Sequence, residues 1–310
     1  MRHFLNITDF SSAELWKFLH KAKELKDELK SSGRNRHVLK NKILGMIFQK
    51  PSLRTRVSFE VGMFQLGGEA IYLSPGEIQL GIRESVPDIA RVLSSYVDGI
   101  MARVFSHDHI LQLAEYSRVP VINGLSDYSH PCQALTDIFT IWEHFGTVKG
   151  LKIAYVGDGN NMATSLVTIA VKMGSHFSIA APAGYQLPPS ILSENKSLAE
   201  ETEVRIEVTD DPVEAITDAD ILYTDVWTSM GQEMEAAERL KVFPPYQVNG
   251  QLLAKAKPNM KVMHCLPAHR GEEITDEVAD GAQSLLFHQA ENRLHAQKGI
   301  LALLLADHQE

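Results

Sequence analysis

Short apolar runs alternate with amphipathic stretches along almost the whole chain. The apolar runs of the first half have the length of buried strands and fall at 42–48, 69–73, 98–104 and 119–123. Helical patterns are expected over 53–66, 86–96, 106–117 and 131–145. Strands that alternate with helices predict an open parallel sheet with helices on both faces, which places the chain in the α/β class.

A second series of the same kind follows the segment FGTVKG at 145–150, whose glycines and polar residues suit a domain boundary. Strands are expected at 151–157, 176–182, 204–208, 220–225 and 261–267, and helices at 161–173 and up to about 218. A length of 310 residues also suits two domains. We expect domains at 1–148 and 149–288, with a closing helix at 289–310 that joins the first domain.

The composition of the chain limits the kinds of molecule that it is expected to bind. A net charge of −9 argues against nucleic acid or a membrane surface, because both attract basic proteins. The two cysteines, Cys132 and Cys265, are too few for a disulfide framework and lack metal-ligand spacing. The N-terminal residues lack the apolar core of a signal peptide, and the apolar run at 300–306 is too short to span a bilayer. We therefore expect a cytoplasmic protein.

The segment FQKPSLRTR places Arg54 and Arg56 in the first turn of a predicted helix. Cations at this positive end of the helix dipole cost about 0.3–1 kcal/mol each unless an anion lies nearby. With Ser52 as N-cap, the first amides would form a phosphate cradle with Arg54 as its charged arm. Apolar positions 57, 59, 61, 63, 64 and 66 predict a helix that is buried almost all round, which favours this hypothesis over two solvated arginines.

Other polar residues follow later strands, where ligands of parallel sheets bind. They are Arg103, His130 before a proline, Gln133, Asp225, the segment Ser229-Met230-Gly231, and Cys265. Each has an ordinary alternative: a histidine in such a loop is commonly a capping or packing residue, and a strand-end cysteine is commonly buried. The segment VGDGNNM gives only a weak dinucleotide signal, because Met162 replaces the third glycine and no acidic residue ends the next strand.

The motifs are more specific in combination. S-x-R-T-R, H-P-C-Q, D-x-W-x-S-M-G and H-C-L-P occur in the order found in the aspartate/ornithine carbamoyltransferase family, and the chain resembles that family up to the closing QAENRLHAQKGIL. The resemblance implies two domains facing each other with the active site in the cleft between them. Domain 1–148 would bind carbamoyl phosphate and domain 149–288 would bind ornithine.

The resemblance also implies a set of site residues. Those for carbamoyl phosphate are Ser52, Leu53, Arg54, Thr55, Gln79, Arg103, His130, Pro131, Cys132, Gln133, Cys265, Leu266 and Arg293. Those for ornithine are Asn161, Asp225, Ser229 and Met230. The catalytic residues would be Arg103, His130, Asp225 and Cys265. No metal or cofactor is implied, and Gln79 would reach a neighbouring subunit's site in a homotrimer.

Two parts of the sequence bear on how this chain compares with other members of the family. Leu53 replaces the threonine that is more usual in S-T-R-T-R, so a hydroxyl is lost while the backbone amide remains. Cys265 and the S-M-G segment favour ornithine over aspartate, whose branch of the family carries H-P-L-P at the late strand. The same residues serve arginine synthesis and arginine breakdown, so the metabolic direction stays open.

The implied reaction transfers the carbamoyl group to the δ-amine of L-ornithine, giving L-citrulline and phosphate. We expect Cys265 to contact the substrate without bonding to it covalently, and carbamoyl phosphate to bind first. Three alternatives remain: a carbamoyltransferase for another amine such as putrescine, a nicotinamide-dependent oxidoreductase, and a non-catalytic sensor with the same anion cradle.

Overall fold

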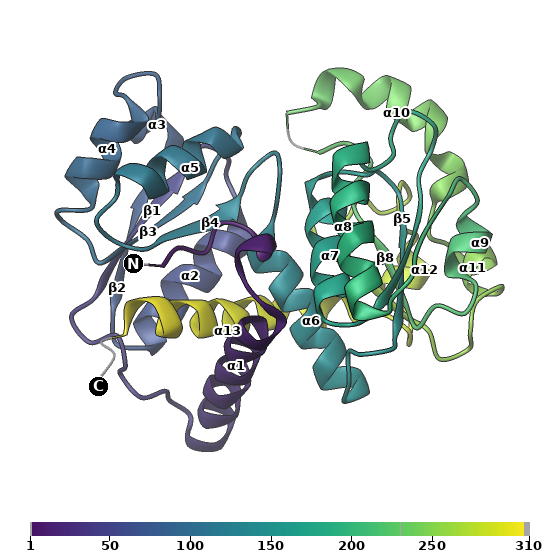
Figure 1. Cartoon of the computed structure of the whole chain (residues 1–310), viewed down its shortest axis with the longest axis horizontal. Helices are drawn as coiled ribbons and strands as arrows, with labels where there is room; N and C mark the ends of the chain where they lie inside the picture. The colour runs from purple at the N-terminus through teal and green to yellow at the C-terminus, as the bar shows by residue number, and fades with distance from the viewer. Residues whose placement is uncertain (1, 230, 307–310) are drawn as a thin grey trace. The chain divides into compact units, whose positions relative to one another are not determined.

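The computed structural model describes residues 2–229 and 231–306 (Figure 1). They form two compact units: the described residues of Met1–Thr136 with Glu291–Glu310, and Asp137–Ala290. The division falls inside helix α6 (Pro131–Phe145), earlier in the chain than the boundary that we predict from the sequence. Each unit is built on one parallel sheet, so the predicted α/β class with two parallel-sheet units is confirmed.

The first unit has a four-stranded sheet in the order β2-β1-β3-β4. Its strands are β1 (Ile43–Phe48), β2 (Glu69–Leu73), β3 (Gly99–Arg103) and β4 (Val121–Leu125). Its helices are η1 (Ile7–Asp9), α1 (Ser12–Ser32), α2 (Leu53–Gln65), α3 (Pro75–Ile78), α4 (Val86–Leu93) and α5 (His107–Tyr116). The central strands β1 and β3 are buried along nearly their whole length, as expected for strands that are apolar on both faces.

Helices cover both faces of this sheet. On one face, α4 and α5 pack over an apolar core that includes Ile47, Ile89, Ile100 and Ile110, as Figure 1 shows. On the other face lie α2 and the closing helix α13 (Leu286–Leu305), which are joined by a hydrogen bond from Lys298 Nζ to Gln65 Oε1 (3.0 Å).

Helix α1 packs against α13 at close range. A Cβ atom at Gly299 would lie 2.8 Å from the carbonyl oxygen of Phe18, so glycine permits this contact between the two helix backbones. The buried Lys26 of α1 also donates to Asn292 Oδ1 of α13 (2.6 Å). The N-terminal helix therefore fixes the position of the helix that carries Arg293.

The second unit has a five-stranded sheet in the order β7-β6-β5-β8-β9. Its strands are β5 (Lys152–Val156), β6 (His176–Ala180), β7 (Ile206–Thr209), β8 (Ile221–Thr224) and β9 (Lys261–His264). Its helices after α6 are α7 (Asn161–Lys172), α8 (Pro189–Thr202), α9 (Pro212–Ile216), η2 (Glu233–Glu235), α10 (Ala236–Val242), η3 (Pro244–Tyr246), α11 (Gly250–Leu253) and α12 (Asp276–Ala279). The core beneath them includes Val156, Leu222, Phe243 and Val262.

Most local predictions are confirmed, and one is wrong. Ser11 and Glu14 form a capping box at the start of α1. Helix α2 is not buried almost all round, because Val57 and Phe64 are 44% and 78% exposed. Its buried side chains instead follow one stripe that includes Phe59 and Met63, so α2 has one face toward the sheet and one toward solvent.

Each helix within residues 2–229 and 231–306 is too short or too polar to cross a membrane.

Candidate active site

The first unit places its predicted phosphate residues at the point where strand order reverses. After β1 the chain continues to β2 on one side and later to β3 on the other, so the carboxyl ends of β1 and β3 mark a topological switch point. Helix α2 is the next element after β1, and Ser52 is its N-cap, with the Thr55 amide donating to Ser52 Oγ (3.3 Å). Arg103 is the last residue of β3 and is 9% exposed.

Helix α13 brings a third guanidinium group to the same place. Arg293 donates to Gln133 Oε1 of α6 (2.6 Å) and to Thr55 Oγ1 of α2 (3.2 Å). All three side chains are at most 3% exposed. The structure therefore brings together residues that are far apart in the sequence and that we predict for one phosphate site.

A residue that we did not predict supports Arg293. With the oxygen of the buried Gln297 amide facing Arg293, it accepts hydrogen bonds from Nη2 (2.8 Å) and Nε (3.3 Å). The Gln297 nitrogen then donates to Ser58 Oγ, and Ser58 donates to the carbonyl oxygen of Arg54. The only signal in the sequence was the spacing of Arg293 and Gln297, one helical turn apart.

His130 lies among these cations. Burial holds the pKa of His130 well below its usual range, and the positive charges of Arg293, Arg103 and Arg54 lower the pKa further. The imidazole is therefore neutral at physiological pH, and the surrounding charge favours an anionic ligand. The arrangement can bind a phosphoryl group while it offers polarised donors to a neighbouring carbonyl oxygen.

Three neighbouring side chains play no direct part in this cluster. Arg56 stacks over the Tyr72 ring (3.9 Å to the centroid) and donates to Glu60 Oε1 (2.9 Å), so its charge is already paired within the chain. The Leu53 side chain is 73% exposed. Cys132 donates to the Asn123 carbonyl oxygen (3.3 Å), and burial raises the pKa of this thiol to about 12, so the thiol is unreactive.

Gln79 occupies an exposed turn after α3. It is the C-cap residue of α3 and has a left-handed backbone (φ 42°). Among the hydrogen bonds of the described residues, none joins its side chain to the guanidinium cluster.

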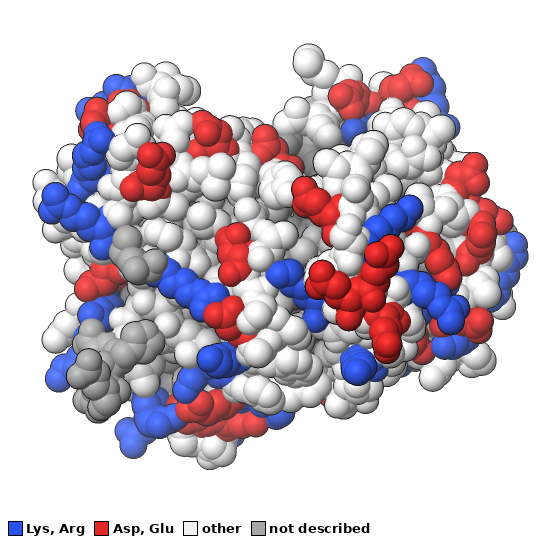
Figure 2. All heavy atoms as spheres, in the orientation of Figure 1, with Lys and Arg blue, Asp and Glu red and all other residues white. Residues whose placement is uncertain are grey.

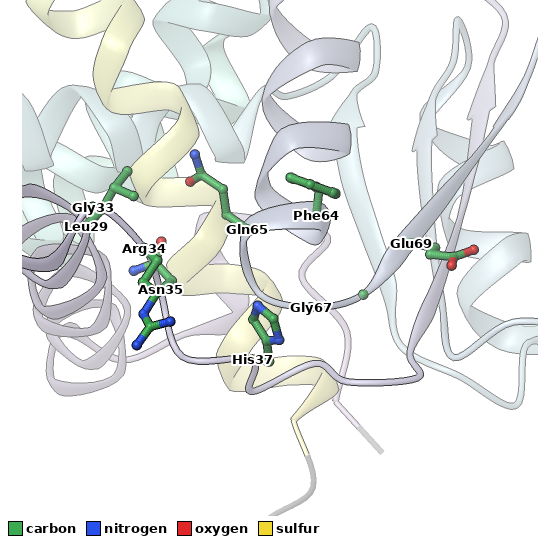
Figure 3. A pocket seen from close by; sticks show the side chains of 10 residues that line it. Leu29, Gly33, Arg34, Asn35, His37, Phe64, Gln65, Gly67 and Glu69 are labelled. Carbon is green, nitrogen blue, oxygen red and sulfur yellow. The ribbon is translucent and has the colours of Figure 1, made fainter.

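A separate cavity of about 490 Å³ lies at the ends of α1 and α2. Figure 3 shows Asn35, His37, Phe64 and Gln65 around it, and the buried Lys298 donates to Asn35 Oδ1 (2.7 Å). None of the predicted site residues lines this cavity. The convergence of buried cations, and not the size of a cavity, therefore identifies the candidate site.

In the second unit, the predicted ornithine residues follow β5 and β8, the strands on either side of that sheet's switch point. Asp225, 6% exposed, comes directly after β8. Its Oδ2 accepts from Asn160 Nδ2 (2.9 Å), and its Oδ1 accepts from the Val226 amide (2.8 Å) and from Cys265 Sγ (2.9 Å). This buried carboxylate is held by hydrogen-bond donors that follow the carboxyl ends of β5, β8 and β9, and it can bind an ammonium group.

Asn160 is a second residue that sequence reasoning missed. Its Oδ1 caps α7 by accepting from the amides of Met162 and Ala163, while its Nδ2 holds Asp225 and lies 3.5 Å from Ser229 Oγ. The predicted Asn161 is the first residue of α7. Met230, predicted to bind ornithine, lies outside the described residues.

The H-C-L-P segment is held by a buried histidine. His264 Nδ1 accepts from the Leu266 amide (2.8 Å), so His264 Nε2 carries the proton that is donated to Glu273 Oε1 (3.0 Å). Both ring nitrogens of His264 are therefore engaged, and this residue is not placed to deprotonate Cys265. The Cys265 thiol instead donates to Asp225, which does not favour a thiolate nucleophile.

An ion pair fixes both flanks of the segment that contains Ser229. Arg239 Nη1 donates to Asp158 Oδ2 (2.8 Å) and to the carbonyl oxygen of Trp227 (2.7 Å), and Arg239 also pairs with Glu235 (2.9 Å). Burial raises the pKa of Asp158 to about 6, although Arg239 opposes the rise. Neither charged residue was singled out from the sequence.

The weak dinucleotide signal also has a structural explanation. The Gly159 amide donates to the Tyr185 carbonyl oxygen (2.7 Å), and a Cβ atom at Gly159 would lie 2.4 Å from the backbone of Gln186 and Leu187. The glycine therefore allows close approach of the chain itself at the place where a dinucleotide-binding turn would approach a pyrophosphate.

Among residues 2–229 and 231–306, two groups of side chains have metal-ligand atoms close together: Asp225, His264 and Cys265, and His269, Glu272 and Glu273. Within the first group, both ring nitrogens of His264 already form hydrogen bonds, and the Cys265 thiol donates a hydrogen bond to Asp225. The hydrogen bonds of the group fit an organic ligand's ammonium group better than an ion's coordination sphere.

Comparison with known proteins identifies the family of the chain. Residues 2–143 match the family model "Aspartate/ornithine carbamoyltransferase, carbamoyl-P binding domain", and residues 149–304 match the model for its "Asp/Orn binding domain". The chain is 54% identical to the ornithine carbamoyltransferase of Anoxybacillus flavithermus over 304 residues, covering 98% of this chain and 96% of the relative.

A solved structure, that of ornithine carbamoyltransferase from Pyrococcus furiosus, is 53% identical and superposes with a TM-score of 0.95. The match covers 98% of this chain and 97% of the other. This chain belongs to the aspartate/ornithine carbamoyltransferase family.

Proposed function

We propose that the protein is an ornithine carbamoyltransferase, which transfers the carbamoyl group of carbamoyl phosphate to the δ-amine of L-ornithine and releases L-citrulline and phosphate. The observation that carries the proposal is the cluster in which the partly buried Arg54 joins the buried Arg103, His130 and Arg293 around the start of α2, opposite in charge to a phosphoryl ligand. Membership of the family supplies the reaction class.

The phosphate is assigned to the first turn of α2. Helix geometry directs the first amides outward from the N-terminus, and the charge of Arg54 adds to the helix dipole there. Arg293 is held rigidly by Gln133 and Thr55, so little reorganisation is needed when the anion binds. Leu53 contributes its amide alone, since its side chain is exposed.

The carbamoyl carbonyl is assigned to Arg103 and His130. As the amine attacks, negative charge grows on the carbonyl oxygen, and preorganised donors stabilise it. Loss of one such donor typically raises the barrier by about 2.7–4 kcal/mol. Neutral His130 can donate one hydrogen bond without adding a mobile proton to the site.

Ornithine is assigned to Asn161, Asp225, Ser229 and Met230. The support is the buried carboxylate of Asp225, which suits an α-ammonium group, and the hydroxyl of Ser229 beside it. The δ-amine must be neutral to attack, which at pH 7 costs about 4–5 kcal/mol for a lysine-like pKa. The departing phosphate can accept the proton that the amine then loses.

Cys265 and Leu266 complete the proposed substrate contacts. The Sγ of Cys265 donates to Asp225, which supports a polar and non-covalent role for the thiol. A carbamoyl adduct on Cys265 found by mass spectrometry would contradict this assignment.

Small molecules are the proposed partners, together with further copies of the chain. Basic and acidic side chains are interspersed on the face that Figure 2 presents, which supports small-molecule ligands over a polyanion such as nucleic acid. Both cysteines are free thiols, which supports a reducing, cytoplasmic location.

A homotrimer is proposed on the basis of exposed apolar side chains. Helix α2, the edge strand β2 and the turn that follows α3 expose Leu53, Val57, Phe64, Ile71 and Ile82 by 44% to 85%. Apolar residues exposed together with an unpaired strand edge are typical of subunit interfaces. In such an assembly the exposed Gln79 would reach a neighbouring subunit's site.

Titration calorimetry with carbamoyl phosphate tests the phosphate assignment. Arg54→Ala removes a charged donor, so we expect the affinity to fall about tenfold or more. The matched control is Arg118→Ala, which removes an exposed arginine from the same unit and should leave the affinity unchanged. Equal affinity in wild type and Arg54→Ala would contradict the assignment.

A further inference from the structure

Gln49 connects three parts of the first unit. It is the residue directly after β1, and its backbone amide donates to the Arg103 carbonyl oxygen at the end of β3 (2.8 Å). Its side-chain Nε2 donates to the Leu80 carbonyl oxygen (3.1 Å), and its Oε1 accepts from the Phe105 amide (3.0 Å) and lies 3.4 Å from His109 Nδ1. One amide group thus bridges the turn after α3 and the segment after β3.

The turn that Gln49 holds is the one that carries Gln79. The Leu80 side chain is 1% exposed and packs in the apolar core under α4, so Leu80 is the buried anchor of an otherwise exposed turn. The turn closes on itself, because the amides of Ile82 and Arg83 donate to the Gln79 carbonyl oxygen (2.9 and 3.0 Å). Gln49 therefore fixes the whole turn through its hydrogen bond to Leu80.

We propose that Gln49 is a positioning residue that holds the turn carrying Gln79 in the place from which Gln79 enters the neighbouring subunit's site. Because Gln49 is also hydrogen-bonded to the backbone of Arg103, it links the active site of its own subunit to the active site of the neighbouring subunit in the trimer. The inference rests on the proposed trimer with shared sites. The chemistry requires an amide, since one group must donate to a carbonyl and accept from an amide at the same time.

Steady-state kinetics give the first test. Gln49→Met keeps the length of the side chain but removes the hydrogen bonds of the amide to Leu80, Phe105 and His109, and Gln49→Asn keeps the amide but is too short to reach Leu80 and Phe105 together. We expect each variant to raise the KM for carbamoyl phosphate about fivefold or more, with a smaller change in kcat. The matched controls are Gln251→Met and Gln251→Asn, at an exposed glutamine of the second unit, and they should leave both constants unchanged.

Hybrid trimers separate an effect on the neighbouring site from an effect on the same subunit's own site. Co-expression of Gln79→Ala with Arg54→Ala subunits creates sites with an intact Arg54 from one subunit and an intact Gln79 from the next. Such hybrids should regain the wild-type KM at these sites. Hybrids of Gln49→Met with Arg54→Ala should do the same, because the Arg54→Ala subunit supplies a correctly held turn.

The outcomes are distinct. Recovery in both hybrids supports the inference. Recovery with Gln79→Ala but not with Gln49→Met would show that Gln49 acts on its own subunit's site, which overturns the inference and leaves the shared-site trimer standing. No recovery with Gln79→Ala, while the wild-type protein still forms citrulline, would overturn the shared site and the coupling by Gln49, and would leave the proposed reaction intact.

Discussion

At the scale of single residues, the sequence predicted the charged groups better than the side chains that hold them. Arg54 and Arg103 stand at a helix start and a strand end, Arg293 is implied by the family resemblance alone, and the structure gathers the three around His130. Gln297 and Asn160 escaped notice because a neutral amide is unremarkable until its partners are known. Their roles depend on contacts between segments far apart in the chain.

Gln297→Leu is expected to weaken use of carbamoyl phosphate. The substitution leaves two donors of the buried Arg293 without their acceptor, so kcat/KM for carbamoyl phosphate should fall about tenfold or more. Gln297→Glu retains an acceptor for Arg293 and should lose less. Equal losses in the two variants, measured by citrulline formation, would indicate a packing effect and contradict this role.

Asp158→Asn tests at which pH the Asp158 carboxyl, which is paired with Arg239, becomes ionised in the folded protein. Because burial raises the pKa of Asp158 to about 6, the folded protein keeps a proton there that the unfolded chain releases near pH 4. The contribution of Asp158 to the free energy of unfolding is thus fully present below about pH 4 and is lost as pH rises through about 6. The difference in unfolding free energy between wild type and variant should shrink by at most about 3 kcal/mol over this range.

Urea unfolding at a series of pH values between these limits measures that difference. A constant difference between wild type and Asp158→Asn would show that Asp158 is ionised throughout and is held by Arg239.

At the scale of elements, periodicity located the strands because they are short, apolar and regularly separated. It failed for α8, whose buried positions are only Ile191, Asn195 and Ala199, too few apolar residues for a helical stripe. It overestimated the burial of α2, because the apolar Val57 and Phe64 lie on the side of the helix that the rest of the described chain leaves exposed. Periodicity shows which residues are apolar but does not show what covers them.

Gly299→Ala tests the packing of α1 on α13. The added methyl group would lie 2.8 Å from the Phe18 carbonyl oxygen, so the helices must separate, and we expect a loss of about 1–3 kcal/mol in unfolding free energy. Gly76→Ala is the matched control, since a Cβ atom there meets no atom within 4 Å. Equal unfolding free energies for the two variants in urea would contradict the proposed close contact.

At the scale of the whole molecule, the two-unit α/β architecture followed from the order of strands and helices, and the family followed from four motifs in one order. The exact division of the chain did not, because α6 contributes to both units and its sequence carries no break. Assembly is also a property that one chain's pattern indicates only indirectly, through exposed apolar residues.

The double variant Phe64→Glu with Ile71→Glu tests the proposed trimer. Charges on α2 and on the edge strand β2 should prevent association, so sedimentation should give a monomer, and activity should fall if Gln79 must come from a neighbour. Phe287→Glu, an exposed aromatic of the second unit, is the control. Unchanged sedimentation of the double variant would exclude this face as the interface.

An assay of carbamoylated product from carbamoyl phosphate tests whether the protein transfers the carbamoyl group to ornithine at the Arg54 cluster. Ornithine, N-acetylornithine, putrescine and aspartate would be supplied as competing acceptors to wild type and to Arg54→Ala. We predict that wild type forms citrulline in preference to the other products and that Arg54→Ala loses this activity. Preference for another acceptor, or full activity in Arg54→Ala, would contradict the account.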